Sequence, residues 1–567
     1  MKRIFFLLTA LCAVLTASAE QYATVSLTDG STHSYGIVSV NDITFSNDAT
    51  LLYLHNTDGL TVTYPVACIT SIDFEEYISD VPMPYTTDFD VAFDNTDDTS
   101  YTSVTEKVPT KDTDPEYGDF VENYDDDEES KGTVTITYNG TSAAITYNPT
   151  SLKNKAVLVM SDTSSDVVIY GMKKVDYVVK GATTDGSLTI YGAKKCKLNL
   201  NNVSIKNADG PAINMPKTVM SGTEFGGKTV FVELTGTSTL EDGTYTPDGT
   251  KGKATFFSEG QLIFSGKGTL NIKSNSGHGI ASDDYIRLRG GSNNPVINIT
   301  TSNSKDGISV NDYFLMYGGT LTINAADDGI SVAKGYADIA GGKLTVNAAD
   351  EGIVATNEEA AADVDPSITV RGGLLKITTT GDKGHALKAG ANISQTGGIV
   401  QAQVKGAGSK AFNADGNCSF TGGKTTVLVD GLPIYDEEEN DVSSAAGIRS
   451  RGTLTLDGAT LAIKATAEGG KGINSTGNIL CKSGSVTIVN AKGKYTSNGK
   501  TSRARGINAD NDVTISGGTL RIRSVDNAIS TPATLAISGG NLQAFSSEST
   551  SISAATVSHT AGWLVTR

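Results

Sequence analysis

Acidic side chains occupy matching positions in consecutive segments of this sequence. An acid stands directly before a Gly-Ile pair in three successive segments, as Asp306, Asp328 and Glu351. A second acid stands one place earlier in two of them, as Asp327 and Asp350. Carboxylates held side by side raise one another's pKa, and a bound cation relieves that conflict. Calcium suits such a set, because it takes six to eight oxygen ligands at about 2.3 to 2.6 Å.

The predicted calcium site also includes acids on the turn that follows, namely Asp283, Asp284 and Asp312. In the flanking segments the residue before the corresponding glycine is not acidic: it is His278, Lys383, Lys471 or Arg505. The acidity is therefore local. Three interpretations stay open: solvated Asp residues that only help the backbone turn, a calcium ion that stabilises the fold, or a calcium ion that also contacts a ligand.

A second set of side chains could bind sugar. Three tyrosines stand five residues before successive Gly-Gly pairs: Tyr285, Tyr313 and Tyr336. The residues four and two places before Gly-Gly are mostly apolar, so strand alternation predicts that the tyrosines point outward. The same face carries Arg287, Arg289, Leu315, Tyr317, Asp338 and Arg371. Tyrosine rings stack on sugars and guanidinium groups bind hydroxyls or uronate carboxylates. Aromatic stacking that only stabilises the fold is the alternative.

A repeat positions all of these residues. Gly-Gly, sometimes altered, recurs at 290, 318, 341, 372, 397, 422, 458, 483, 517 and 539, with a shortest spacing of 22 or 23 residues. Short strands of period two, cut by glycine turns at this interval, predict a parallel β-helix. Its stacked coils, about 4.8 Å apart, bring equivalent residues face to face. A β-propeller is less suitable, because it needs about 40 residues and four strands per unit.

The first 79 residues predict an exported protein with a small leading domain. Residues 1–19 combine Lys2-Arg3, an apolar run and Ala17-Ser18-Ala19, which is typical of a signal peptide cleaved after Ala19. We therefore expect a secreted or cell-surface protein. A lipoprotein would require acylation of Cys12, but Leu11 stands where a small residue is expected. Residues 20–79 alternate apolar and polar side chains and predict a small β module, which resembles the N-terminal β modules of exported Bacteroidetes proteins.

The rest of the chain divides into two parts. Residues 80–132 hold 17 acidic and 3 basic side chains and predict a solvated acidic linker. A calcium loop at Asp112, Asp114 and Glu116 is the alternative, although it lacks the glycine and distal Glu of an EF-hand. Residues 133–567 are assigned to the β-helix, with regular repeats at about 254–545.

Charge and composition limit the possible partners. The chain has a formal net charge of −18, which repels nucleic acid and anionic lipid. After residue 19 the sequence has no run of about 20 apolar residues, so we expect no membrane insertion, and we expect a monomer. Cys418 and Cys481 fall at core positions of the repeat, which predicts small buried hydrophobes. The five histidines lie far apart and give no sign of a zinc site or a Ser-His-Asp triad.

With these motifs in hand, the chain resembles the exported bacterial carbohydrate-binding domain proteins. The resemblance covers roughly residues 150–545 and rests on Ser282-Asp283-Asp284, Gly290-Gly291, Lys305-Asp306-Gly307-Ile308 and Gly319-Thr320-Leu321-Thr322-Ile323. It implies an all-β, right-handed parallel β-helix with bound calcium, similar in fold to family 9 polysaccharide lyases. It also implies binding to cellulose-like or pectin-type polymers.

Three functions follow from the sequence. The leading hypothesis is non-catalytic binding of polysaccharide by a calcium-stabilised β-helix. The second is a calcium-dependent pectate lyase, whose β-elimination needs a neutral Lys or Arg as base; Lys305 and Lys334 flank the acids and are the candidates. The third is a surface adhesin or structural rod without glycan specificity. Fold likeness alone cannot choose among them, because function resides in the site.

Overall fold

The structure is a computed structural model that describes residues 21–76, 84–106, 124, 129–161, 164–220, 222–247, 252–302, 304–358, 360–361 and 364–567. The predicted signal peptide, its cleavage site and the alternative at Cys12 lie outside the described residues. The alternative calcium loop at residues 112–116 lies outside them as well.

Strands form almost all of the regular structure. The three helices of the described part are single 3-10 turns, Ile37–Ser39, Val66–Cys68 and Thr150–Leu152. None of the described helices is long and apolar enough to cross a membrane. The prediction of an all-β chain is confirmed.

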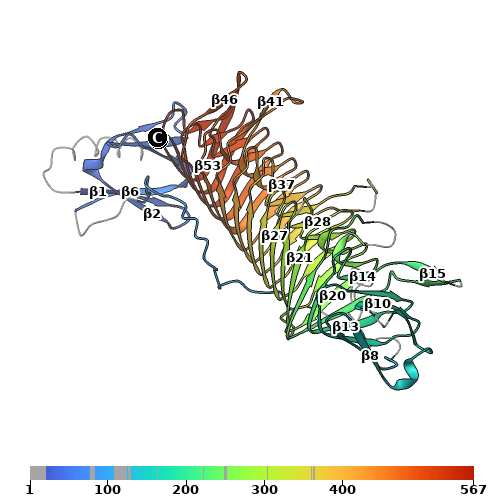
Figure 1. Cartoon of the computed structure of the whole chain (residues 1–567). Coiled ribbons are helices and arrows are strands. Elements are labelled where there is room, and N and C mark those ends of the chain that lie inside the picture. The colour runs from blue at the N-terminus through green and yellow to red at the C-terminus, as the bar shows by residue number, and fades with distance from the viewer. Residues whose placement is uncertain are drawn as a thin grey trace.

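Each central coil contributes three short strands, whereas in the last coils the first two merge into one long strand such as β49 (Val513–Ser524). In one coil these are β23 (Ile286–Leu288), β24 (Val296–Thr301) and β25 (Ile308–Val310). The next two coils contribute β26 (Phe314–Met316), β27 (Thr320–Ala325) and β28 (Ile330–Val332), then β29 (Ala337–Ile339), β30 (Lys343–Ala348) and β31 (Ile353–Ala355). Equivalent strands pair in parallel from coil to coil. The predicted parallel β-helix is thus confirmed (Figure 1).

Alternating side chains fill the interior of the coils. In β27, Leu321 and Ile323 are fully buried while Thr320 and Thr322 lie on the outer face. Burial of a Leu or Ile side chain contributes about 1.5 to 3 kcal/mol, so the stacked apolar columns are the main source of stability. Cys418 and Cys481 are free thiols buried in this core, as predicted.

The Gly-Gly phrase turns the chain between two strands of a coil. Its second glycine has a positive φ, +79° at Gly319 and +80° at Gly342, a conformation that only glycine adopts without cost. A Cβ on Gly342 would also lie 2.6 Å from the carbonyl oxygen of Gly319 in the previous coil. The turn therefore requires glycine for both its shape and its close stacking.

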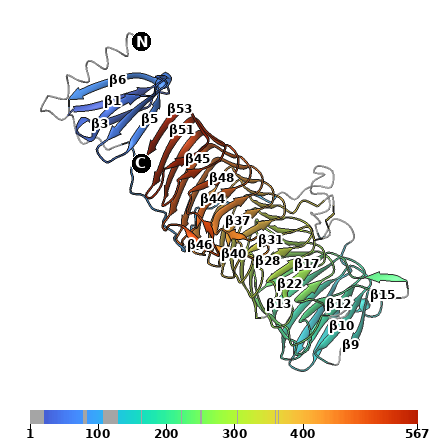
Figure 2. The same cartoon turned by 90° about the horizontal axis from the view of Figure 1, so that it is seen from above.

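The N-terminal module caps the end of the β-helix that is formed by the last coils of the chain. Strands β1 (Gln21–Leu27), β2 (Thr32–Gly36) and β6 (Ile69–Glu76) form one antiparallel sheet. Strand β5 (Thr61–Pro65) pairs antiparallel with β53 (Thr556–Thr566), the last strand of the chain. Figures 1 and 2 show the module against this end. The cap covers a strand edge that would otherwise be open to pairing with another chain.

Residues 84–106, which we call the strap, run back along the β-helix from the capped end (Figure 1). The sequence predicted a solvated linker here. The described part instead lies against the outer face of the β-helix, because its carboxylates meet lysines and arginines there: Asp90 pairs with Lys464 and Asp98 with Lys424.

Candidate metal centre and strap-covered face

The predicted acids lie at one corner of the β-helix, between β24 and β25 and their equivalents. Ile308 pairs with Ile330, and Ile330 with Ile353. Asp306, Asp328 and Glu351 each come two residues before these positions. They therefore form one column along the corner, as the sequence predicted.

The glycine between each acid and Ile lets the turns stack closely. A Cβ on Gly329 would lie 2.3 Å from Cγ1 of Val346 and 2.5 Å from the carbonyl oxygen of Gly352. Both distances are far below van der Waals contact. Glycine at this position is thus the local feature that brings carboxylates of neighbouring coils together.

Three carboxylates converge at the corner. Asp327, Asp328 and Asp350 each offer one oxygen, and these three atoms lie within 4.8 Å of one another. All three residues are half-buried. The backbone N–H of Glu351 donates to Oδ1 of Asp328 at 2.9 Å, which ties the second coil to the third. We call Asp327, Asp328 and Asp350 the acidic triad.

The triad carries poorly compensated negative charge. Burial, and then the charge of Asp306, raises the pKa of Asp328 to about 6. Burial and the adjacent Glu351 raise the pKa of Asp350 to about 6. The pKa of Asp327 is raised by burial and by Asp306 and Asp350. A cation bound here would favour the ionised forms.

A histidine and a lysine stand at the two ends of the triad. The carboxylate of Asp306 lies 3.2 Å from Nδ1 of His278. The buried Glu351 accepts a hydrogen bond from Nζ of Lys388 at 2.6 Å. No ion pair reaches the triad itself among the described residues. A metal ion would therefore meet three carboxylates flanked by two acids that already have partners.

Asp283, Asp284 and Asp312 do not join this site, contrary to the prediction. They lie at the next corner, which the three-residue strand β25 separates from the triad. Asp283 pairs with Lys253 at 2.7 Å, and the Gln261 amide donates to Asp284. The backbone N–H of Asp312 donates to the carbonyl of Asp284 at 3.1 Å. Proximity in sequence misled the prediction, because a β-helix turns sharply between these corners.

The acidic column becomes basic further along the same corner. Leu387 pairs with Ile353, so His385, and not the predicted Lys383, follows Glu351 in the column. Phe412 pairs with Leu387, which places Lys410 next. Nδ1 of His385 accepts a hydrogen bond from the Lys410 backbone N–H at 3.0 Å. Burial holds the pKa of His385 well below its usual value, with Lys410 adding to the effect.

The sequence did not indicate Lys388, His385 or Lys410 as neighbours of the acids. The longer segment after Glu351 shifts Gly384 out of register, so counting from glycine selects Lys383. The pairing of β31 with β34 (Leu387–Ala389), which the glycine spacing does not show, places Lys388 beside the acids. Its side chain is on the outer face of β34. Burial lowers the pKa of Lys410 to about 7, and its Nζ donates to the carbonyl of Gly408 and to Ser443.

The tyrosine face is covered, and the prediction of an open platform is wrong. Tyr285 is only 2% exposed and packs in a cluster with Tyr124, Phe231 and Ile263. Arg287 is also 2% exposed and pairs with Glu106 of the strap. The side chains alternate along the strands as predicted. The outward face is covered because Tyr124 and Glu106, which belong to the predicted linker, pack on it.

The remaining members of this face are partly covered. The rings of Tyr313 and Tyr336 are half-buried, with centroids 4.6 Å apart. Tyr317 is buried, and Arg287 lies over its ring at 5.1 Å. Arg289 is partly exposed, 3.7 Å from Glu106. These contacts favour the alternative interpretation, in which the aromatic column stabilises the coils.

The two lysines considered for a lyase lie at different corners. Lys305 is exposed beside the triad, where its charge opposes the rise in the pKa of Asp327. The backbone N–H of Lys334 donates to the carbonyl of Asn311 at 2.6 Å, which places it at the corner of Asp312. Of these two lysines, Lys305 is the one near the acidic triad.

The fold and the acidic corner together define a class: parallel β-helix proteins that carry a carboxylate cluster at one corner. A family model described as "Carbohydrate-binding domain-containing protein" matches residues 163–494 and 449–550. These matches span more than half of the chain. The chain therefore belongs to this carbohydrate-binding domain family, and the resemblance predicted from the repeats is confirmed at that level.

Other comparisons give one structural likeness. A solved structure described as a polysaccharide lyase-like protein from C. thermocellum, in a gadolinium derivative, is similar with 17% identity and a TM-score of 0.36. The likeness covers 51% of this chain and 97% of that one. No curated protein matches the sequence.

Proposed function

We propose that this protein binds an acidic, pectin-type polysaccharide through calcium held by the acidic triad. The observation that carries the proposal is the convergence of three carboxylate oxygens within 4.8 Å on adjacent coils. Membership of a carbohydrate-binding family supports polysaccharide as the ligand. We also propose that the protein acts outside the cell, after cleavage at Ala19.

The donor set suits calcium. Three carboxylates supply at most six oxygens, and Oδ1 of Asp328 is already engaged by the Glu351 N–H. Calcium takes six to eight oxygens, which leaves positions for water or for the carboxylate and hydroxyls of a uronate. A neutral, cellulose-like polymer lacks the carboxylate, so the site favours the acidic polymer.

A retention assay tests the proposal. Full-length protein is passed over immobilised polygalacturonate and over cellulose, each with calcium and with a chelator. We expect retention on polygalacturonate to be much stronger in calcium than with the chelator. The variant Asp328→Asn/Asp350→Asn should lose this calcium-dependent increase in retention, whereas Asp283→Asn/Asp312→Asn at the next corner should keep it.

Two outcomes would contradict the proposal. Equal retention with and without the chelator would show that polysaccharide binding does not depend on calcium. Retention on cellulose but not on polygalacturonate would keep glycan binding and overturn the acidic specificity. Melting temperatures of both variants show whether any loss is due to unfolding.

A further inference from the structure

The strap is an acidic segment laid on a basic face. Residues 84–106 contain six acids, Asp88, Asp90, Asp94, Asp97, Asp98 and Glu106, and no lysine or arginine. Four of these acids pair with cations of the β-helix, and the two others, Asp88 and Asp94, make no ion pair among the described residues. The strap therefore resembles a short linear polyanion held on the sheet.

The pairs are spread over several coils of the β-helix. Asp90 lies 2.6 Å from Nζ of Lys464, and Asp98 lies 2.9 Å from Nζ of Lys424. Asp97 lies between two lysines, 3.0 Å from Lys376 and 2.5 Å from Lys343. Glu106 pairs with Arg287 and lies 3.7 Å from Arg289. We call Arg287, Arg289, Lys343, Lys376, Lys424 and Lys464 the basic row.

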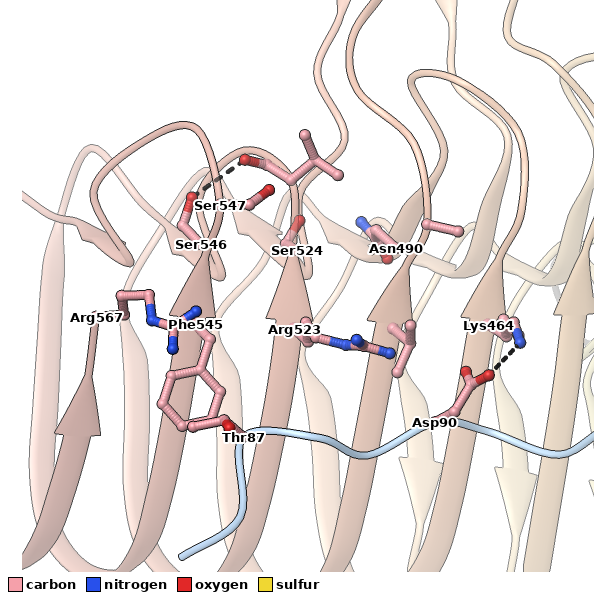
Figure 3. Close-up of a pocket in the computed structure, with 13 residues that line it drawn as sticks. Thr87, Asp90, Lys464, Asn490, Arg523, Ser524, Phe545, Ser546, Ser547 and Arg567 are labelled. Atoms are coloured by element: carbon pink, nitrogen blue, oxygen red, sulfur yellow. Dashed lines mark hydrogen bonds and ion pairs between the residues drawn. The ribbon is translucent and has the colours of Figure 1, made fainter. Parts of the chain in front are cut away.

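Two backbone–backbone hydrogen bonds join the described strap to the coils, and the side chains of Gln401 and Lys376 also donate to its carbonyl oxygens. The N–H of Val104 donates to the carbonyl of Ala340 at 2.7 Å, and the N–H of Gly373 donates to the carbonyl of Thr102 at 2.8 Å. No described residue of the strap belongs to a strand. Figure 3 shows the strap crossing the strands near Asp90 without joining the sheet. The ion pairs of Asp90, Asp97 and Asp98 are partly exposed and individually weak, so a multivalent anion could replace them, whereas the pair of Glu106 with Arg287 is buried.

Pockets lie at both ends of the strap. One, of about 350 Å³, is lined by Asp90, Lys464, Arg523 and Ser524, and Figure 3 shows Arg523 extending beside the strap. Nε of Arg523 is buried and has no hydrogen-bond partner among the described residues. The other pocket, of about 720 Å³, is lined by Arg289, Asn293, Asn294 and Tyr317, among others. Such cationic, amide and aromatic linings suit the carboxylates, hydroxyls and ring faces of acidic sugars.

We propose that the basic row is a second binding site, for a linear polyuronate, and that the strap occupies it as an intramolecular competitor. This site lies on the face beneath the strap, away from the acidic triad, and needs no calcium. The polymer would first contact the pocket at Arg523 and then displace Asp90, Asp98 and Asp97 in turn. Only molecules whose basic row is free of the strap can bind the polymer. The apparent affinity is therefore the intrinsic affinity multiplied by the fraction of such molecules.

The test measures binding of a polygalacturonate oligomer to full-length protein in chelator. Asp97→Asn/Asp98→Asn should strengthen binding by about three- to tenfold, since it removes two competing charges. The matched control Asp88→Asn/Asp94→Asn changes the strap charge equally but removes no ion pair, and should bind like the wild type. Lys343→Gln/Lys376→Gln should weaken binding. Melting temperatures report the folding of each variant.

Hydrogen exchange adds a direct readout. Backbone exchange over residues 84–106 should rise when the oligomer binds, because the polymer displaces the strap. No binding in chelator, equal effects of the two strap variants, or binding without faster exchange would each overturn the proposal. Equal binding of polyglutamate would overturn it in favour of an acidic peptide ligand. Because calcium is absent throughout, failure here leaves calcium-dependent retention intact.

Discussion

The backbone N–H of Glu351 donates to Oδ1 of Asp328 at 2.9 Å, while the carboxylate of Glu351 accepts from Lys388 at 2.6 Å. One residue thus joins three consecutive coils at the corner where the acids collect. Stacking of the coils and the charge of the acidic triad are therefore coupled, and a change in either should alter the other.

The stability of the calcium-free protein should depend on pH through the triad. The pKa values of Asp328 and Asp350 are raised to about 6, whereas an unfolded Asp has a pKa of about 3.9. The folded state therefore binds these protons more tightly than the unfolded state. Their contribution to stability is full below about pH 4 and is lost as pH rises to about 6.

Melting temperatures of the wild type and of Asp328→Asn/Asp350→Asn, measured from pH 4 to pH 7 in chelator, check this. The variant should gain stability relative to the wild type as the pH rises. A difference that stays constant over this range would show that the two pKa values are not raised.

Substitution of the corner glycine should destabilise the fold. Gly329→Ala places a Cβ against Val346 and the Gly352 carbonyl, and overpacking of this kind typically costs about 1 to 3 kcal/mol. Urea unfolding measures the change. Ser331→Ala, at a half-buried outward position of the adjacent β28, should alter the free energy of unfolding by less than about 0.5 kcal/mol. Equal effects would refute the stacking argument.

Loss of the Tyr285 ring should affect stability rather than glycan retention. The ring is buried against Phe231 and Ile263, and truncation of a buried aromatic to alanine costs about 3 to 5 kcal/mol. Tyr285→Ala should therefore shift the urea midpoint strongly, while the folded fraction keeps calcium-dependent retention. Loss of retention by folded Tyr285→Ala would restore the ring as a ligand contact.

The coil architecture was predictable from the sequence, whereas the burial of side chains on its outer face was not. Gly319 and Gly342 mark turns that only glycine can form, so the repeat was visible residue by residue. Asp327, Asp328 and Asp350 could be grouped because coil spacing converts register into proximity. The burial of Tyr285 and Arg287 depends on Tyr124 and Glu106, whose contacts no local pattern encodes.

Undocking of the N-terminal module should be visible through the single tryptophan. Trp563 is buried in the cluster that joins the module to the last coils, with its ring centroid 5.0 Å from that of His33. Val62→Asp puts a charge opposite Val565 in the buried β5–β53 pair. We expect a red shift of tryptophan emission and concentration-dependent association, because the edge of β53 becomes open.

Thr61→Asp is the control for this change, since Thr61 is half-buried and pairs with the partly exposed Thr566. Its emission should match that of the wild type. Unchanged emission and a monomeric Val62→Asp protein would show that the module does not act as a cap.

Calorimetric titration of calcium into the full-length protein at pH 7.5 tests whether the acidic triad holds calcium. We expect binding with a dissociation constant below about 1 mM, the range of extracellular calcium modules. Binding should be absent in Asp328→Asn/Asp350→Asn and retained in Asp283→Asn/Asp312→Asn. Identical titrations of the wild type and the triad variant would show that the triad does not bind calcium.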